Sequence, residues 1–342
     1  MRAAITTPRH ELEVIDIDDP HVGEHQLLLR VEWAGICGSD LHLVEVVGPG
    51  VVLGHEFVGT VQSVGAGVEG FVIGDRACAV PALGCSQCLA CLSGDPVHCA
   101  GGVRVVGNEA RGAFAEYVVV SALQAVRVPD EVRTDVAALV EPLAIGVKVL
   151  GRARLQADER LLVIGAGPIG LAVVLWARQQ GVGDILVSEP VASRRELALE
   201  MGATAATDPA TETLVDASQR ELGRLPEVVI ECAGLPGLLD AAVQAVAPFG
   251  RLVVAGLHLK REEFYRFDAL MKEITMEFPN FAVKQGFRHS LRLLSQNRVD
   301  PRPLVTHRIQ LDALPEMFHA LRTPNNFGKV LVSPSRPIPR DE

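Results

Sequence analysis

A strand-like run that leads straight into a glycine motif constrains the fold of this chain more than any other segment. The run, LLVIGAGPIGLAVVLWA, occupies residues 161–177 and contains G-x-G-x-x-G where the strand pattern gives way to a helical one. Glycines there permit a tight turn and let a pyrophosphate approach the backbone amides at the helix N-terminus. The motif predicts a dinucleotide-binding turn. Its expected contact residues are Gly165, Gly167, Pro168, Ile169 and Gly170.

An acidic residue follows the next predicted strand. Glu189 stands about twenty residues beyond the glycines, where a carboxylate binds the ribose hydroxyls of the adenosine. A carboxylate there repels a 2′-phosphate, which favours NAD over NADP. Arg194 and Arg195 lie just beyond it, and they can either pair with such a phosphate or face solvent on a helix. NADP therefore stays open as an alternative.

The pattern changes character near residue 147. Before it, short alternating apolar segments separated by Gly, Pro and Asp predict a mostly β domain. After it, buried-strand runs alternate with helical stretches, which predicts a doubly wound parallel sheet with helices on both faces. The expected strands are 160–164, 184–188, 227–231 and 251–255, and the expected helices between them include 193–201 and 238–246.

The length of 342 residues also exceeds what one hydrophobic core usually supports. We therefore expect an α/β chain of two domains, with residues 1–146 and 281–342 in one and 147–280 in the other. The returning tail should hold a helix at 285–296 and a last strand at 329–332. Residues 333–342, rich in Pro and Arg, are expected to form a mobile terminus.

Four of the seven cysteines lie within the run CSQCLACLSGDPVHC. Such spacing, with a Gly-Asp-Pro loop before the last thiol, is typical of a closed tetrahedral zinc site rather than of incidental thiols or disulfides. The chain opens MRAAITTPRHELEV, without an apolar signal stretch, so we expect a cytoplasmic protein with reduced thiols. The predicted structural zinc lobe spans about 84–100. Its ligands are Cys85, Cys88, Cys91 and Cys99.

Composition argues against two classes of partner. A net charge of −10 and a pI near 5.5, with no run of lysine or arginine, argue against nucleic acid. The longest apolar run, 161–177, is interrupted by three glycines and a proline and is too short to cross a bilayer, so no membrane partner is expected.

Further metal-ligand residue types occur in three separate segments. Cys37 lies in GICGSDLH, His55 and Glu56 in GHE, and Glu141 in EPL. A catalytic zinc needs three protein ligands and an open position. Spacing alone does not bring these residues together. Taken singly, Cys37 could be a buried thiol, His55 a core histidine and Glu141 a helix N-terminal acid.

Taken together, the motifs resemble the zinc-dependent alcohol dehydrogenases of the medium-chain dehydrogenase/reductase superfamily, especially the polyol, butanediol and threonine dehydrogenase branch. The resemblance covers nearly the whole chain: GICGSDLH, GHEFVGTV, GDRA, the four-Cys lobe, GAFAEY, EPLA, GAGPIG, SEP and FGKV. It implies a GroES-like, mostly β catalytic domain and a Rossmann cofactor domain. It also implies that Cys37, His55 and Glu141 hold a catalytic zinc, and that Glu56 holds the zinc-bound water or joins the metal transiently.

The same resemblance assigns roles to neighbouring residues. Asp40 would receive the N–H of His55 and fix its tautomer. Ser39 would take the alcohol proton and pass it through the cofactor ribose to His42 and then to solvent. Lys329 would contact the cofactor pyrophosphate from the returning tail.

The implied activity is hydride transfer between a secondary alcohol, diol or polyol and NAD, with two zinc ions per subunit in a homo-oligomer, either a dimer or a tetramer. An NADPH-dependent carbonyl reductase and a non-enzymatic dinucleotide-binding protein stay open as alternatives. A zinc hydrolase is disfavoured because hydrolysis has no use for a dinucleotide.

Overall fold

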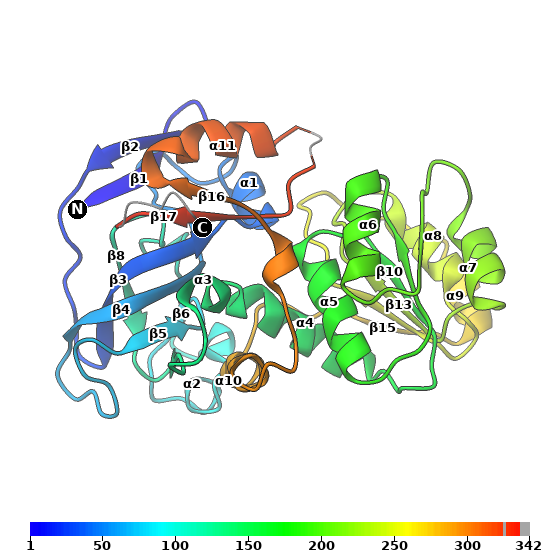
Figure 1. Ribbon diagram of the computed structural model, residues 1–342, viewed down its shortest axis with the longest axis horizontal. Coiled ribbons are helices and arrows are strands. Elements are labelled where there is room, and N and C mark those ends of the chain that lie inside the picture. The colour runs from blue at the N-terminus through cyan, green and yellow to red at the C-terminus, as the bar shows by residue number, and fades with distance from the viewer. Residues whose placement is uncertain (324–325, 336–342) are drawn as a thin grey trace. The chain divides into compact units, whose positions relative to one another are not determined.

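The computed structural model of the protein describes residues 1–323 and 326–335. The chain divides into two compact units, coloured along the sequence in Figure 1. The first unit comprises Met1–Ala144, Ala282–Arg298 and Val305–Glu342, and the second comprises Ile145–Phe281 and Val299–Leu304. Along the described ranges, none of the helices combines the length and apolarity needed to cross a membrane.

The first unit is built on a seven-stranded sheet in the order β16-β17-β3-β4-β5-β9, with β8 also paired to β3. Its strands are β3 (Gln26–Gly35), β4 (Glu56–Val64), β5 (Arg76–Ala79), β8 (Tyr117–Ser121), β9 (Ala125–Arg127), β16 (Val305–Gln310) and β17 (Lys329–Ser333). Alternating residues of β3 such as Leu27, Leu29 and Val31 are fully buried and join one core with Phe114. The predicted mostly β domain is therefore present. Two small sheets complete it: β1 (Arg2–Thr6) with β2 (Leu12–Asp16), and β6 (Ala82–Leu83) with β7 (Arg104–Val105).

Short helices connect the strands of this unit. They are α1 (Gly38–Leu43), α2 (Leu89–Leu92), η1 (Pro96–His98), α3 (Thr134–Ala137), α10 (Lys284–Ser295), η3 (Leu311–Ala313) and α11 (Leu314–Leu321). Helix α4 (Val140–Ala153) contains the boundary between the units, and η2 (Arg302–Leu304) belongs to the second unit.

The returning tail packs on the four-Cys lobe through α10. Phe287, Leu291 and Leu294 are buried along one face of this helix. At its start, the Lys284 amide donates to the Gly94 carbonyl at 3.1 Å, and the Lys284 ammonium donates to the Leu123 carbonyl at 2.6 Å. The last strand ends at a buried Ser333, which the sequence had assigned to a mobile terminus. Residues 336–342 of that predicted terminus lie outside the described residues.

The second unit is a doubly wound α/β fold. Its six strands are all paired in parallel, in the order β12-β11-β10-β13-β14-β15. They are β10 (Leu161–Ile164), β11 (Ile185–Ser188), β12 (Ala205–Thr207), β13 (Val228–Glu231), β14 (Arg251–Val254) and β15 (Thr275–Glu277). The helices are α5 (Pro168–Gln179), α6 (Ala192–Glu200), α7 (Leu214–Leu222), α8 (Leu238–Ala245) and α9 (Arg266–Lys272). In Figure 1, α5 and α6 lie on one face of the sheet, and α7 and α8 lie on the other.

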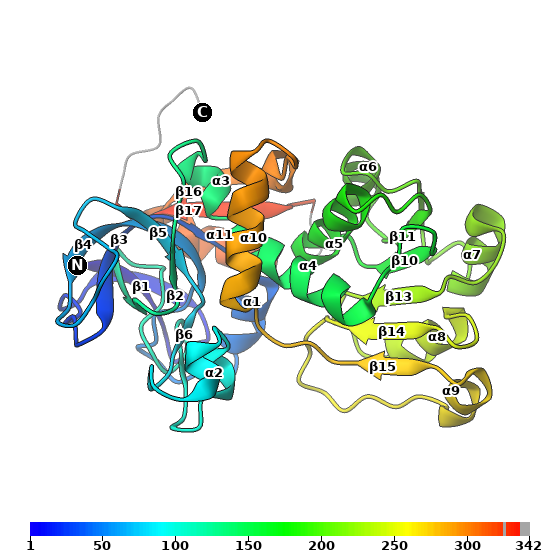
Figure 2. The same ribbon diagram turned by 90° about the horizontal axis from the view of Figure 1, so that it is seen from below.

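The four predicted strands of this unit and the predicted helices α6 and α8 are confirmed to within one residue at each end. The two strands that were not predicted, β12 and β15, lie at the two edges of the sheet, visible for β15 in Figure 2. Each has three residues, and β15 has no fully buried residue, so neither carries the continuous apolar run that identifies a central strand.

Candidate functional site

Three metal-ligand side chains converge at the paired ends of β3 and β4. Gly35 pairs with Glu56 in the antiparallel ladder, so the residues just beyond the two strand ends are neighbours. One ligand atom each from Cys37, His55 and Glu56 lie within 4.8 Å of one another. Thiolate, imidazole and carboxylate in one cluster are the donors that zinc prefers. The donor set therefore fits a zinc ion.

Asp40 fixes the orientation of this cluster from helix α1. Its side chain is fully buried, one carboxylate oxygen accepts the Cys37 amide at 3.0 Å, and the other lies 3.2 Å from His55 Nδ1. His55 Nε2 then points to the opposite side, 3.4 Å from Ser39 Oγ. Burial opposes a charge on the ring, but Asp40 and Cys37 outweigh it and raise the pKa of His55 well above its ordinary value. This negative surrounding suits a bound cation.

Lys329 makes a contact that the sequence did not predict. Its ammonium donates to the two carboxylate oxygens of Glu56 at 2.7 and 2.6 Å and to the Ile36 carbonyl at 2.9 Å. Both charged side chains are only 1% exposed. These contacts engage all three N–H donors of the ammonium, and the expected contact of Lys329 with a cofactor pyrophosphate stays a prediction.

Gly35 makes room for this ion pair. A Cβ atom at Gly35 would stand 2.2 Å from Glu56 Oε2, well inside van der Waals contact. Strand β17 pairs with β3 at Gly35, which places Lys329 two residues before that point, at the same strand end. In the sequence, the signal for such a pair is a lysine at the head of the otherwise apolar run KVLVS, since a lysine inside a buried strand needs a partner.

Glu141 is the predicted ligand that lies apart from the three converging atoms. It stands in the first turn of α4, is 6% exposed, and is absent from the set of ligand atoms within 4.8 Å of one another, which Glu56 completes instead. Burial is the main cause that raises its pKa to about 7, with His55 and Lys329 opposing and Glu56 and Asp40 adding. Glu141 therefore shares the electrostatic surroundings of the cluster.

His42 is exposed on α1. It stands three residues after Ser39 and lies on the same side of the helix.

The four-Cys lobe brings its thiols together as the spacing predicts. One sulfur each from Cys85, Cys88, Cys91 and Cys99 lie within 4.8 Å of one another. All seven cysteines fall within the described residues, and all are free rather than disulfide-bonded. The thiols of the lobe differ: the backbone amides of Cys91 and Ala100 lower the pKa of Cys88 to about 6, whereas burial raises the pKa of Cys91 to about 12. A Cβ at Gly84 would lie 2.5 Å from Cys91 Sγ, so the loop closes tightly on the sulfurs.

The glycine motif forms the turn between β10 and α5. Gly165 has a φ of +95°, and a Cβ there would lie 2.9 Å from the Ala233 amide nitrogen. A Cβ at Gly170 would lie 2.0 Å from the Gly165 carbonyl oxygen. Gly167 caps α5, and Pro168 and Ile169 open the helix, where a proline needs no amide donor. The turn therefore requires glycine at Gly165 and Gly170 for steric reasons, whereas an added Cβ at Gly167 would meet nothing within 4 Å.

Glu189 lies directly beside this turn. Its side chain is 4% exposed, one carboxylate oxygen accepts the Ala166 amide at 2.8 Å, and the other accepts the Val191 amide at 3.1 Å. Each carboxylate oxygen has a second lone pair, so both can still accept a ribose hydroxyl. Arg194 is half-buried on α6. Arg195 turns back and donates to the Glu189 and Pro190 carbonyls at 2.7 and 2.8 Å.

Comparisons with known proteins agree with both units. An alcohol dehydrogenase GroES-like domain model matches residues 23–130, and a zinc-binding dehydrogenase model matches residues 168–296. The chain is 30% identical to L-threonine 3-dehydrogenase of Pyrococcus horikoshii, over 95% of this chain and 96% of that protein. It is 29% identical to sorbitol dehydrogenase of Bacillus subtilis, over 98% of each.

Solved structures show the same likeness over the whole length. An E. coli short chain alcohol dehydrogenase (RspB) complexed with NADH superposes with a TM-score of 0.89 at 30% identity, covering 97% of this chain and 99% of that one. A zinc-binding dehydrogenase from Sinorhizobium meliloti bound to NADP gives a TM-score of 0.87 at 31% identity, with the same coverage.

Proposed function

We propose that this chain, which belongs to the zinc-binding dehydrogenase family with a GroES-like alcohol dehydrogenase domain, oxidises a secondary alcohol, diol or polyol by hydride transfer to NAD and catalyses the reverse carbonyl reduction. The chain is an oxidoreductase by family. The observation that carries the finer proposal is the convergence of Cys37, His55 and Glu56 on one point, in a partly buried and negatively charged setting.

We assign the catalytic zinc to Cys37 and His55, with Glu141 and Glu56 as the carboxylates beside it. A metal bound there supplies the Lewis acidity that makes loss of the alcohol proton feasible near neutral pH. Asp40 holds His55 so that Nε2 is presented to the metal. Lys329 compensates the charge of Glu56, so that this carboxylate need not neutralise the metal.

We assign the proton path to helix α1. Ser39 Oγ lies 3.4 Å from His55 Nε2 and therefore next to the metal position, where it can accept the alcohol proton. His42 is exposed three residues later on the same helix, where its imidazole can take up the proton and release it to solvent.

We propose NAD as the preferred cofactor. The buried Glu189 carboxylate, held beside the glycine turn, supports this choice because it would repel a 2′-phosphate. The contacts of Arg195 support it too, since this guanidinium binds backbone carbonyls and Asp208. The Sinorhizobium meliloti neighbour binds NADP, so the two nucleotides must be tested against each other.

We propose that the four-Cys lobe holds a second, structural zinc. Four thiols fill a tetrahedral shell and leave no position for a substrate. Free thiols throughout the chain are compatible with a reducing compartment, which supports a cytoplasmic location.

We propose that the protein is a homo-oligomer that assembles through the β15 edge of the second unit. In α9, which lies wholly in the described part of the chain, no residue is buried, although the helix is rich in apolar side chains. An open strand edge beside such a patch favours association. The exposed apolar residues here are Leu257, Leu259, Tyr265, Phe267, Leu270 and Met271. Light scattering should give a dimer or tetramer for the wild type and a smaller species for Leu270→Glu with Met271→Glu.

The function itself is tested with a panel of secondary alcohols, vicinal diols, polyols and threonine, assayed with NAD and with NADP. Zinc-dependent reduction of NAD by at least one alcohol is expected. A clear preference for NADPH with carbonyl substrates would favour the reductase alternative. Absence of turnover in every combination would refute the dehydrogenase proposal.

A further inference from the structure

The side chain of Arg195 bridges two loops of the second unit. From α6, its Nη1 atom donates to the carbonyls of Glu189 and Pro190, which follow β11. The same nitrogen lies 3.1 Å from Asp208 Oδ2, just after β12. Arg195 is 23% exposed and Asp208 is 27% exposed, so the contact is largely shielded from water. An ion pair in such a position is screened less than one on the open surface.

Together with other hydrogen bonds, these contacts hold the backbone and side chain of Glu189 in place. Glu189 is the residue proposed to bind the adenosine ribose. Its amide donates to the Thr207 carbonyl at 3.0 Å, and its carbonyl accepts from Arg195 at 2.7 Å. Its carboxylate accepts the Ala166 and Val191 amides. Every polar group of Glu189 is therefore engaged, and Arg195 supplies the contact to its carbonyl.

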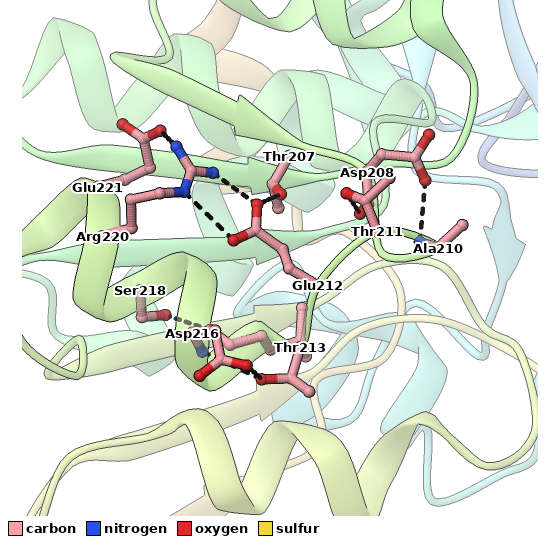
Figure 3. A network of polar contacts seen from close by, with 11 residues as sticks. Thr207, Asp208, Ala210, Thr211, Glu212, Thr213, Asp216, Ser218, Arg220 and Glu221 are labelled. Atoms are coloured by element: carbon pink, nitrogen blue, oxygen red, sulfur yellow. Dashed lines mark hydrogen bonds and ion pairs between the residues drawn. The ribbon is translucent and has the colours of Figure 1, made fainter.

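Asp208 is itself held in place by its loop. Its other carboxylate oxygen accepts the Ala210 amide at 2.9 Å, and its carbonyl accepts both the amide and the hydroxyl of Thr211. Figure 3 shows Glu212, four residues on, between Thr207 and Arg220, with the Arg220 Nη2 contact at 2.5 Å. Asp208 is thus a fixed partner that leaves one oxygen directed at Arg195.

The local charge balance follows from this arrangement. Glu189 and Asp208 are negative and Arg195 is positive, so one negative charge remains among the three. A guanidinium that is not so held would bind a phosphate with paired, charge-assisted hydrogen bonds. A 2′-phosphate must therefore compete with Asp208 for Arg195.

We propose that Asp208 is a specificity-determining residue for the nucleotide. By neutralising Arg195 and keeping it on the Glu189 turn, it converts an arginine that could bind a 2′-phosphate into a positioning residue for the ribose-binding carboxylate. The inference rests on the proposed nucleotide-binding function and names the residue that sets its selectivity.

The test uses the full-length metal-loaded protein and two adenosine probes, 5′-AMP and 2′,5′-ADP, titrated by calorimetry. Asp208→Asn removes the charge but keeps the size. It should tighten 2′,5′-ADP binding on the order of tenfold, because one charge-assisted competitor is lost, and change 5′-AMP binding much less. Asp216→Asn is the matched control. This residue lies in the network of Figure 3, loses the same charge, and contacts Thr213 rather than Arg195.

Two further variants identify the group responsible. Adding Arg195→Ala to Asp208→Asn should abolish the gain for 2′,5′-ADP, because the released guanidinium is then absent. Asp208→Glu should restore the preference for 5′-AMP. Thermal unfolding of each variant confirms that the fold is retained.

The outcomes distinguish a failure of the proposed role of Asp208 from a failure of nucleotide binding itself. If Asp208→Asn leaves the ratio of the two affinities unchanged, weakens both equally, or matches Asp216→Asn, the role of Asp208 is wrong while nucleotide binding stands. If the wild type binds neither 5′-AMP nor NAD, the nucleotide-binding function fails and the inference fails with it.

Discussion

Lys329 and Glu56 form a fully buried ion pair between residues 273 positions apart, with the ammonium 2.6–2.7 Å from both carboxylate oxygens. Burying two charges is costly, and their mutual attraction repays this only when both are present. The pair therefore couples the last strand of the chain to the proposed metal centre, since Glu56 follows His55 directly.

Removing one partner of this buried pair should lower the free energy of unfolding far more than removing a charge at the surface. Lys329→Met is expected to lower the free energy of unfolding by about 3–5 kcal/mol, because the Glu56 carboxylate is left buried without compensation. Arg302→Met serves as the control, since its partner Asp300 is half-exposed and exposed pairs contribute less than about 1 kcal/mol. Urea unfolding measures both. Equal losses of unfolding free energy in the two variants would contradict a special stabilising role of the buried pair.

Gly35→Ala should perturb the same pair through sterics alone. The added Cβ would stand 2.2 Å from Glu56 Oε2, so the carboxylate must move or the strands must separate. We expect lower stability and weaker retention of the catalytic zinc, measured by unfolding and metal analysis. Gly48→Ala, where a Cβ meets nothing within 4 Å, should leave both unchanged. A Gly35→Ala protein that matches wild type in both would show that this close approach is unimportant.

Cys88→Ser should separate the structural metal from the chemistry. Three thiolates hold zinc less well than four, so bound zinc should fall from two ions per chain to one and the unfolding temperature should drop. Turnover measured below that temperature should persist while the lobe stays folded. Metal analysis measures the bound zinc, and thermal unfolding measures the change in unfolding temperature. An unchanged zinc content would argue that this lobe holds no metal.

The acid stability of the protein should depend on Asp135. Burial opposes its charge, but hydrogen bonds from Arg133 and Arg308 outweigh this and hold the pKa of Asp135 below its ordinary value of 3.8. A lowered folded pKa means that the stabilisation is complete above 3.8 and is lost as the pH falls through the folded value.

Asp135→Asn should therefore be less stable than wild type at pH 7, and the difference should shrink below the ordinary pKa. Unfolding curves from pH 7 down to the acid limit of the wild type measure this. Asp130→Asn, at a fully exposed carboxylate 3.8 Å from Arg76, should show little of either effect. A stability gap that widens on acidification would reverse the predicted sign.

Short sequence patterns predicted those parts of the molecule that depend on residues close together in the chain. The turn at Gly165 and the buried Glu189 follow from short spacings around one strand and one helix, and the four-Cys loop follows from its own run. The ion pair of Lys329 with Glu56 was not predicted, because the two residues are 273 positions apart and no spacing rule connects them. The sequence leaves two interpretations of Arg195, pairing with a 2′-phosphate or facing solvent, because only the fold brings Asp208 to it.

The proposed metal centre shows the same division. The sequence identified every residue of the cluster, but its choice of Glu141 over Glu56 as the third ligand came from family resemblance. The structure gathers Glu56 with Cys37 and His55 and keeps Glu141 nearby, in shared electrostatic surroundings. Which carboxylate would complete the shell of a metal bound there depends on geometry, which residue types alone do not give.

A zinc ion at Cys37 and His55 that carries alcohol oxidation, as proposed above, is tested by Cys37→Ser. Zinc content, NAD affinity by calorimetry and the initial rate of NAD reduction are measured on the same preparation. We expect the variant to lose one zinc ion and all turnover while largely retaining its affinity for NAD. Wild-type turnover in Cys37→Ser, or a full zinc content, would show that this thiol does not hold a working zinc.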